Sequence, residues 1–402
     1  MNDHLRQLMR DATRLTRAGR LDEATTVIQL ALRGTSAPAT SAPATVQSVQ
    51  CAEQLKPGKF GSVTLDAIAT TPGGNVYDVD ATDYNAANAD VVTAESACCD
   101  GPQGSTAVLR PAEAAATAHI AGRYSSGSHT HLSRTIHYKL YAPTGHAERQ
   151  LPLVVMLHGC GQHPDDFAAG TRMNAAAREQ GFFVLYPAQS PTANASRCWN
   201  WFQPADQARG RGEPALIASL ALAVVKQYNL DARRIYIAGL SAGGAMATIV
   251  AAAYPEIFAA VGVHSGLARG AASNVLEALS VMQSGDPNWE RAGSGMHVSA
   301  PTIVFHGDQD QTVHPRNGEQ AVAAVRGRKG DAETVRGVSA RGRHFTRSIH
   351  ADETGKPIAE HWLLHGAGHA WSGGDAAGSY TDASGPDATR EMLRFFFTHQ
   401  CP

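Results

Sequence analysis

The chain has 402 residues, 43% hydrophobic and 17% charged, a length that fits one large domain with an extension because domains commonly hold roughly 100–200 residues. Its 34 basic and 36 acidic residues nearly balance, which argues against a nucleic acid or an anionic membrane surface as the main partner. The 39 glycines and 20 prolines indicate long loops or a weakly ordered portion.

The N-terminal part of the chain predicts two regions outside the main domain. Residues 1–33 carry apolar side chains at roughly helical spacing, interrupted at Gly19, which predicts a short helical hairpin serving as an appendage or a docking element. Residues 34–118 are rich in Ala, Thr, Ser, Pro and Gly, which predicts a weakly ordered linker. No apolar run of the length of a signal peptide or membrane helix opens the chain.

Residues 119–402 predict an α/β domain. Apolar runs typical of strands alternate with helical patterns, and a hairpin is predicted over 345–364. Continuous apolar runs suit strands covered on both faces, so we expect a mainly parallel sheet with helices on both sides. The predicted strands are 134–142, 151–157, 181–187, 234–239, 259–264, 301–306 and 360–364, and the predicted helices are 213–228, 242–254, 316–325 and 388–399.

The strongest local motif is GLSAG, from Gly239 to Gly243, which directly follows an apolar strand pattern and directly precedes a small-residue helix. In a nucleophile elbow the serine occupies a strained turn between strand and helix, and the flanking glycines avoid collisions that a Cβ would cause. The motif therefore predicts Ser241 as a catalytic nucleophile. A plain structural turn is the alternative.

A serine hydroxyl needs a general base and an acid that orients the base. In hydrolases with this elbow the order along the chain is Ser, acid, His. The turn after strand 301–306 offers Asp308 and Asp310, and spacing alone leaves both open. Among the late histidines, His369 lies in a glycine-rich loop, whereas His361 and His365 fall within or at the end of a strand pattern and are expected to be structural.

The oxyanion of a tetrahedral intermediate needs two preorganised donors. We expect them to be the backbone N–H of Ala242, directly after the nucleophile, and that of Cys160 in the turn His158–Gly161. No cluster of ligand residues has a recognisable metal spacing, so neither a metal nor another cofactor is predicted.

Five segments together resemble the poly(3-hydroxybutyrate) depolymerase family of esterases, which is related to the feruloyl and acetyl-xylan esterases of carbohydrate esterase family 1. These segments are LHGCGQ (157–162), RCWNWF (197–202), GLSAGGAM (239–246), HGDQDQTV (306–313) and GAGHAWSGG (366–374). The resemblance covers about residues 130–400 and implies an α/β-hydrolase fold, with Ser241, Asp310 and His369 as the triad. It also implies a disulfide between Cys160 and Cys198, with free buried thiols as the alternative, and an extracellular or periplasmic location.

The expected function is therefore a serine carboxylic ester hydrolase, cleaving hydroxyalkanoate-type esters through an acyl-enzyme. A feruloyl or acetyl-xylan type esterase is the alternative, and a scaffold protein on a hydrolase fold is a third hypothesis. His158, Trp199, Trp201 and Trp371 lie close in sequence to catalytic elements and are predicted to bind substrate, the indoles as walls of an apolar cleft. Core packing is the alternative for each indole, and the sequence leaves the oligomeric state open.

Overall fold

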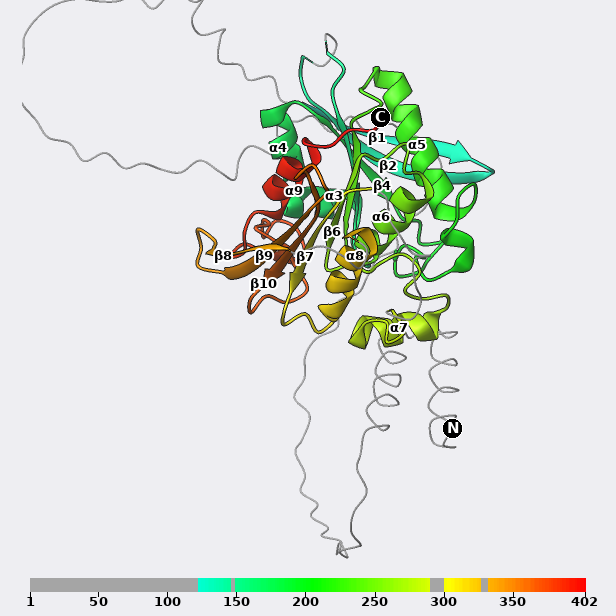
Figure 1. Ribbon diagram of the computed structural model, residues 1–402. Coiled ribbons are helices and arrows are strands. Elements are labelled where there is room, and N and C mark those ends of the chain that lie inside the picture. The colour runs from blue at the N-terminus through cyan, green and yellow to red at the C-terminus, as the bar shows by residue number, and fades with distance from the viewer. Residues whose placement is uncertain (1–121, 146–148, 290–299, 327–331) are drawn as a thin grey trace, which may run out of the picture. The chain divides into compact units, whose positions relative to one another are not determined.

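A computed structural model describes residues 122–145, 149–289, 300–326 and 332–402. The helical hairpin expected at 1–33 and the linker expected at 34–118 lie outside these ranges. Within them the chain forms a ten-stranded sheet with helices on both faces (Figure 1). No helix in these ranges is both long and apolar enough to span a bilayer.

The sheet has the strand order β1-β2-β4-β3-β5-β6-β7-β10-β9-β8. All pairs from β4 to β10 are parallel, whereas β1 and β2 on one side and β9 and β8 on the other pair antiparallel. This confirms the predicted mainly parallel α/β fold and the predicted hairpin. The strands are β1 (Arg123–His131), β2 (Arg134–Ala142), β3 (Leu153–Leu157), β4 (Phe183–Ala188), β5 (Ile235–Leu240), β6 (Ala260–His264), β7 (Thr302–Gly307), β8 (Glu333–Val338), β9 (His344–Ala351) and β10 (Pro357–Leu364).

The central strands are apolar throughout because both of their faces are covered. In β3 all five residues are fully buried; Leu153, Val155 and Leu157 enter one hydrophobic cluster, while Val154 and Met156 enter the other. Successive side chains of a strand point to opposite faces. The continuous apolar run therefore supplies two cores at once, as expected for a buried parallel strand.

Helices cover the two faces in separate groups (Figure 1). One face carries α5 (Gly212–Tyr228), α6 (Ala242–Ala253) and α8 (Arg316–Arg326), and the other carries α3 (Pro164–Thr171), α4 (Met173–Gln180) and α9 (Ala388–Phe396). The four predicted helices are present with their ends moved by a few residues. The sequence analysis did not predict α3, α4 and α7 (Val275–Ser284), because eight to ten residues hold too few turns for a clear apolar periodicity. Short elements complete the domain: η2 (Pro204–Asp206), β11 (Trp371–Ser372) and β12 (Thr381–Asp382).

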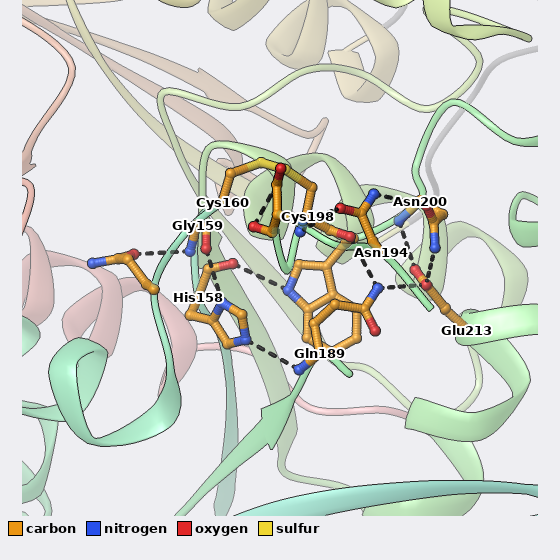
Figure 2. Close-up of a disulfide and its surroundings, with 11 residues drawn as sticks. His158, Gly159, Cys160, Gln189, Asn194, Cys198, Asn200 and Glu213 are labelled. Atoms are coloured by element: carbon orange, nitrogen blue, oxygen red, sulfur yellow. Dashed lines mark hydrogen bonds between the residues drawn. A yellow bond between two sulfur atoms is a disulfide. The ribbon is translucent and has the colours of Figure 1, made fainter. Parts of the chain in front are cut away.

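A disulfide joins Cys160, in the turn after β3, to Cys198, in the loop after β4 (Figure 2). This confirms the pairing that the family resemblance implied. Because β3 and β4 are parallel neighbours, their following loops leave the same edge of the sheet. The disulfide covalently links these two loops at that edge.

Loss of this disulfide should lower the free energy of unfolding. The bridged cysteines are 38 residues apart in sequence, and closing a loop of that length in the unfolded chain stabilises a protein by about 2–4 kcal/mol. Urea unfolding of the Cys160→Ser/Cys198→Ser variant should show this deficit. A reducing agent added to the same measurement should lower the unfolding free energy of the wild type by a similar amount and leave that of the double variant unchanged. Equal unfolding free energies for the wild type and the double variant without reducing agent would contradict the expectation.

Candidate active site

Ser241 lies between the end of β5 and the start of α6, with a strained backbone. Its φ of 56° and ψ of −120° are rare for a residue with a Cβ, and such conformations persist only when the surrounding structure holds them. The Ser241 N–H donates to the carbonyl of His264 on the neighbouring strand at 2.9 Å. Ser241 is 8% exposed, so this strained turn is almost fully buried at the edge of the sheet.

The glycines around Ser241 allow close packing on two sides. A Cβ on Gly239 would collide with the backbone of Gly243, and a Cβ on Gly243 would collide with the carbonyl groups of Leu157 and His158. The first turn of α6 therefore packs directly against the end of β3. This contact brings the backbone after Ser241 next to the turn that contains Cys160.

Two backbone N–H groups in this region have no hydrogen-bond partner among the described residues. The N–H groups of Gly159 and Gly161 are both used, by the Gln162 side chain at 2.9 Å and by a backbone carbonyl at 2.8 Å. Between them, the N–H of Cys160 makes no such bond, and neither does that of Ala242 at the start of α6. A helix start leaves its first N–H groups without intrahelical partners, which accounts for the N–H of Ala242.

Asp310 and His369 form a buried pair. The Nδ1–H of His369 donates to Asp310 Oδ2 at 2.7 Å, and the two side chains are 11% and 0% exposed, respectively. Asp310 Oδ1 accepts the N–H groups of Thr312 and Val313, each at 2.9 Å. Burial alone would raise the pKa of Asp310, but hydrogen bonds from His306 and His369 hold it well below its usual range. An ionised Asp310 at Nδ1 leaves Nε2 of a neutral His369 as a proton acceptor.

The other aspartate of the turn, Asp308, has a different partner. Asp308 Oδ2 lies 3.0 Å from His365 Nδ1, and Asp308 Oδ1 accepts the Gly366 N–H at 2.7 Å. Their side chains are 29% and 39% exposed, against 0% and 11% for Asp310 and His369. His361 lies inside β10, and burial lowers its pKa to about 3. The structure thus separates two Asp–His pairs that sequence spacing could not distinguish.

The loops that carry these residues follow parallel strands and meet at one edge of the sheet. Ser241 follows β5, Asp310 follows β7 and His369 follows β10. The hydrogen bonds of the described residues do not include one between Ser241 Oγ and His369 Nε2. Such contacts are often long in a site without substrate and tighten in the complex.

His264, at the end of β6, links the Ser241 turn to the His369 loop. Its carbonyl accepts the Ser241 N–H, its Nε2 accepts the Ser372 N–H at 2.9 Å, and its ring stacks on Trp371 at 5.2 Å. Burial, followed by the nearby His306 and His369, lowers its pKa to about 3, so the ring is neutral. The sequence analysis missed this role, although a histidine closing an apolar strand pattern is a detectable signal.

The structure does not support the assignment of the three tryptophans as substrate-binding residues. Trp199, Trp201 and Trp371 are 0%, 4% and 1% exposed. The indole N–H of Trp199 donates to the His158 carbonyl at 3.1 Å, and that of Trp371 donates to Thr389 Oγ1 at 3.1 Å. Their rings are part of the two hydrophobic cores. Packing of these large apolar groups accounts for their positions, and Trp199 also lines a cavity beside the loop after β4.

The structure does not support His158 as a substrate-binding residue either, because the residue is buried and holds the turn that contains Cys160. Its ring is 1% exposed. Nε2 accepts the Gln189 N–H at 3.1 Å, so Nδ1 carries the proton and donates to the Gly159 carbonyl at 2.8 Å (Figure 2). Burial lowers the pKa of His158 to about 4, which keeps this bridge between two backbone segments neutral.

A buried carboxylate, not predicted from the sequence, holds the loop after β4. Glu213, at the start of α5, accepts hydrogen bonds from Gln189 Nε2 at 2.6 Å and from Asn200 Nδ2 and backbone N–H at 2.7 and 2.8 Å (Figure 2). Burial, with the nearby Asp206, raises the pKa of Glu213 to about 7. A charged residue in the first turn of a largely apolar helix was the sequence feature that could have indicated this buried carboxyl group.

Two further observations bear on ligand binding. In the part of the chain that the structure describes, no three His, Cys, Asp or Glu side chains gather in a way that could hold a metal ion. A cavity of about 310 Å³ lies beside the loop after β4, and its wall includes Arg134, Gln189 and Glu213 but none of the residues Ser241, Asp310 and His369. The candidate triad therefore does not line this cavity.

Comparison with known proteins places these features in a family. Residues 136–341, about half of the chain, match the family described as Esterase PHB depolymerase. Poly(3-hydroxyalkanoate) depolymerase C of Paucimonas lemoignei is 33% identical over 227 residues, covering 54% of each chain. Feruloyl esterase B of Neurospora crassa is 31% identical over 185 residues, covering 42% of this chain and 62% of the relative. The matches thus span less than two thirds of these relatives' own length.

A solved structure shares the fold. The acetyl xylan esterase from Aspergillus awamori superposes with a TM-score of 0.54 at 21% identity, covering 68% of this chain and 99% of the other. The fold is thus that of the α/β-hydrolases, as expected from the sequence. Together with the match over residues 136–341, this shows that the chain belongs to the PHB depolymerase family of esterases.

Proposed function

We propose that Ser241, His369 and Asp310 form a catalytic triad that hydrolyses carboxylic esters. The observation that carries the proposal is the buried Asp310–His369 pair, with its 2.7 Å hydrogen bond, at the edge where Ser241 adopts its strained turn. The pair keeps His369 in the tautomer that accepts a proton at Nε2. Family membership and the α/β-hydrolase fold agree with the same chemistry.

The proposed reaction proceeds in two steps. Ser241 Oγ attacks the ester carbonyl carbon while His369 Nε2 takes the hydroxyl proton, and the C–O bond to the alcohol then breaks as His369 returns that proton to the leaving oxygen. Water, deprotonated by the same imidazole, then attacks the acyl carbon. The bond from that carbon to Ser241 Oγ breaks, His369 returns the proton to Oγ, and the carboxylic acid is released. Asp310 stays ionised and stabilises the imidazolium that forms in each step.

The N–H groups of Cys160 and Ala242 are the proposed oxyanion donors. Both lack a partner among the described residues, and the close contact between α6 and the end of β3 brings their segments together. Preorganised donors of this kind stabilise developing negative charge without reorganisation during the reaction.

For the substrate we propose hydroxyalkanoate-type esters. The support is the family match and the 33% identity to a protein named as a poly(3-hydroxyalkanoate) depolymerase. Feruloyl and acetyl-xylan esters are the second candidate, because relatives named as feruloyl esterase and acetylxylan esterase are 30–31% identical.

Replacement of Ser241 by Ala should abolish ester hydrolysis while preserving the fold. Removing a triad nucleophile costs roughly 10⁴–10⁶-fold in turnover, because no other group can form the acyl-enzyme. Hydrolysis of p-nitrophenyl acetate by the purified variant measures this loss, and thermal unfolding confirms that the protein is folded. Retained turnover in a folded variant would exclude Ser241 as the nucleophile.

The two aspartates should differ sharply in their effect on activity. Asp310→Asn removes the charge that orients His369, and comparable changes in other triads cost about 10³–10⁴-fold in turnover. Asp308→Asn is the matched control, because Asp308 lies two residues before Asp310 in the same turn and pairs with His365. Its turnover should stay within about fivefold of wild type, because partly exposed pairs of this kind contribute little. Steady-state kinetics on p-nitrophenyl acetate compares them, and the reverse ranking would assign the acid to Asp308.

The wild type should prefer hydroxybutyrate esters to sugar-linked esters. A panel of soluble 3-hydroxybutyrate oligomers, methyl ferulate and acetylated xylan, compared by kcat/KM, measures this preference. We expect the oligomers to be favoured by at least about tenfold, a ratio that corresponds to about 1.4 kcal/mol in transition-state binding. A higher value on methyl ferulate or acetylated xylan would replace the polyester proposal by the carbohydrate esterase alternative.

A further inference from the structure

Tyr380 is an exposed aromatic residue beside His369. Its side chain belongs to the large hydrophobic groups that remain open to solvent, with the residue 53% exposed. Its ring centroid lies 6.4 Å from that of the His369 imidazole, with the ring planes at 82°. In contrast to the three buried tryptophans, this ring offers an accessible apolar surface next to the proposed general base.

The backbone of Tyr380 is in the left-handed region, with a φ of 53°. A bulky residue rarely adopts this conformation, and strain of this kind concentrates at binding and catalytic sites. The strained backbone therefore requires support from neighbouring groups.

Hydrogen bonds supply that support on both sides. Before Tyr380, the Ser379 N–H donates to Asp166 Oδ1 at 2.8 Å, and the Ser379 carbonyl accepts from Gln162 Nε2 at 3.1 Å. The Tyr380 carbonyl itself accepts the Trp371 N–H at 2.7 Å. The segment is thus held both to the start of α3 and to the loop that follows His369.

The same network reaches the proposed oxyanion turn. While the amide nitrogen of Gln162 holds Ser379, its Oε1 accepts the Gly159 N–H at 2.9 Å. One side chain therefore fixes the distance between the turn that contains Cys160 and the segment that contains Tyr380. A segment held in this way can discriminate between substrates, because it loses little conformational entropy when a ligand binds.

We propose that Tyr380 is a specificity-determining residue that packs against the alcohol part of the bound ester. The inference rests on the proposed function, in which His369 returns a proton to the leaving oxygen, so that the alcohol departs beside the imidazole. An aromatic ring next to that position favours alcohols with apolar surface over methanol-sized ones. A second hydroxyacyl unit, as in a polyester chain, is an alcohol of this kind.

The test compares esters that share an acyl group and differ in the alcohol. Linear 3-hydroxybutyrate dimer and methyl 3-hydroxybutyrate form the same acyl-enzyme, so deacylation is common to both and kcat/KM isolates the leaving alcohol. Phenyl acetate and methyl acetate form a second pair that does not depend on a polyester substrate. Tyr380→Gly removes the ring and tolerates the left-handed backbone, and Tyr380→Asn is a second variant suited to that conformation.

We expect both variants to lower kcat/KM by about fivefold to twentyfold on the dimer and on phenyl acetate, with a much smaller change on the methyl esters. Tyr380→Phe should restore most of the loss because it keeps the ring. Leu132→Gly is the matched control: Leu132 is also exposed, with a φ of 47°, and lies in the turn between β1 and β2. Leu132→Gly should leave unchanged the ratio of kcat/KM on the dimer to that on methyl 3-hydroxybutyrate, and likewise the ratio on phenyl acetate to that on methyl acetate.

Equal losses on the large and small alcohols, or no loss, would overturn the role of Tyr380 while leaving the proposed hydrolysis intact. A wild type that cleaves the acetates but neither hydroxybutyrate ester would overturn the polyester substrate, and the acetate pair would then decide the role of Tyr380. A wild type that cleaves none of the four esters would overturn both the proposed function and this inference.

Discussion

The site depends on how closely the first turn of α6 approaches the end of β3. The approach is possible because Gly239 and Gly243 carry no Cβ, and any side chain there would collide with backbone atoms. Close packing forces Ser241 into its strained conformation and brings the N–H of Ala242 near the turn that contains Cys160. The proposed nucleophile and the proposed oxyanion donors thus depend on the same steric constraint, and the positive end of the helix would favour negative charge developing there.

Histidines at strand ends hold the surrounding loops in place. His158 and His264 each accept a backbone N–H at Nε2, and His306 Nε2 donates to the Val313 carbonyl at 2.8 Å. The neutral imidazoles of His158 and His264 can each bridge two segments with one donor and one acceptor, which makes them suited to loops that leave neighbouring strands. His369 differs from His158 and His264 in donating Nδ1–H to a buried carboxylate, that of Asp310. His306 contacts the same carboxylate only through Nε2, at 3.4 Å.

The loop after β4 is held to the same edge by two independent means. The disulfide between Cys160 and Cys198 ties it covalently to the turn after β3, which carries a proposed oxyanion donor. Glu213 anchors it through Gln189 and Asn200. The three hydrogen bonds to this carboxyl group offset only part of the cost of burying it, because its pKa still rises to about 7. The loop therefore contributes to the site as a support for the turn, while substrate contact is proposed for Tyr380.

The sequence by itself determined the parallel sheet, the order of Ser241, an aspartate and His369 along the chain, and the position of the elbow. Apolar runs indicate strands that are buried on both faces, and the glycines of the elbow indicate close backbone contact. Both signals lie within short stretches of the sequence. Residue spacing left Asp308 and Asp310 open and the family resemblance implied Asp310; the tertiary structure shows that Asp310 pairs with His369. Only the tertiary structure decided that the tryptophans are buried and that Tyr380 is exposed beside His369. Chain order places a residue after a particular strand, but the direction of its side chain depends on loop geometry and on neighbours far away in the sequence.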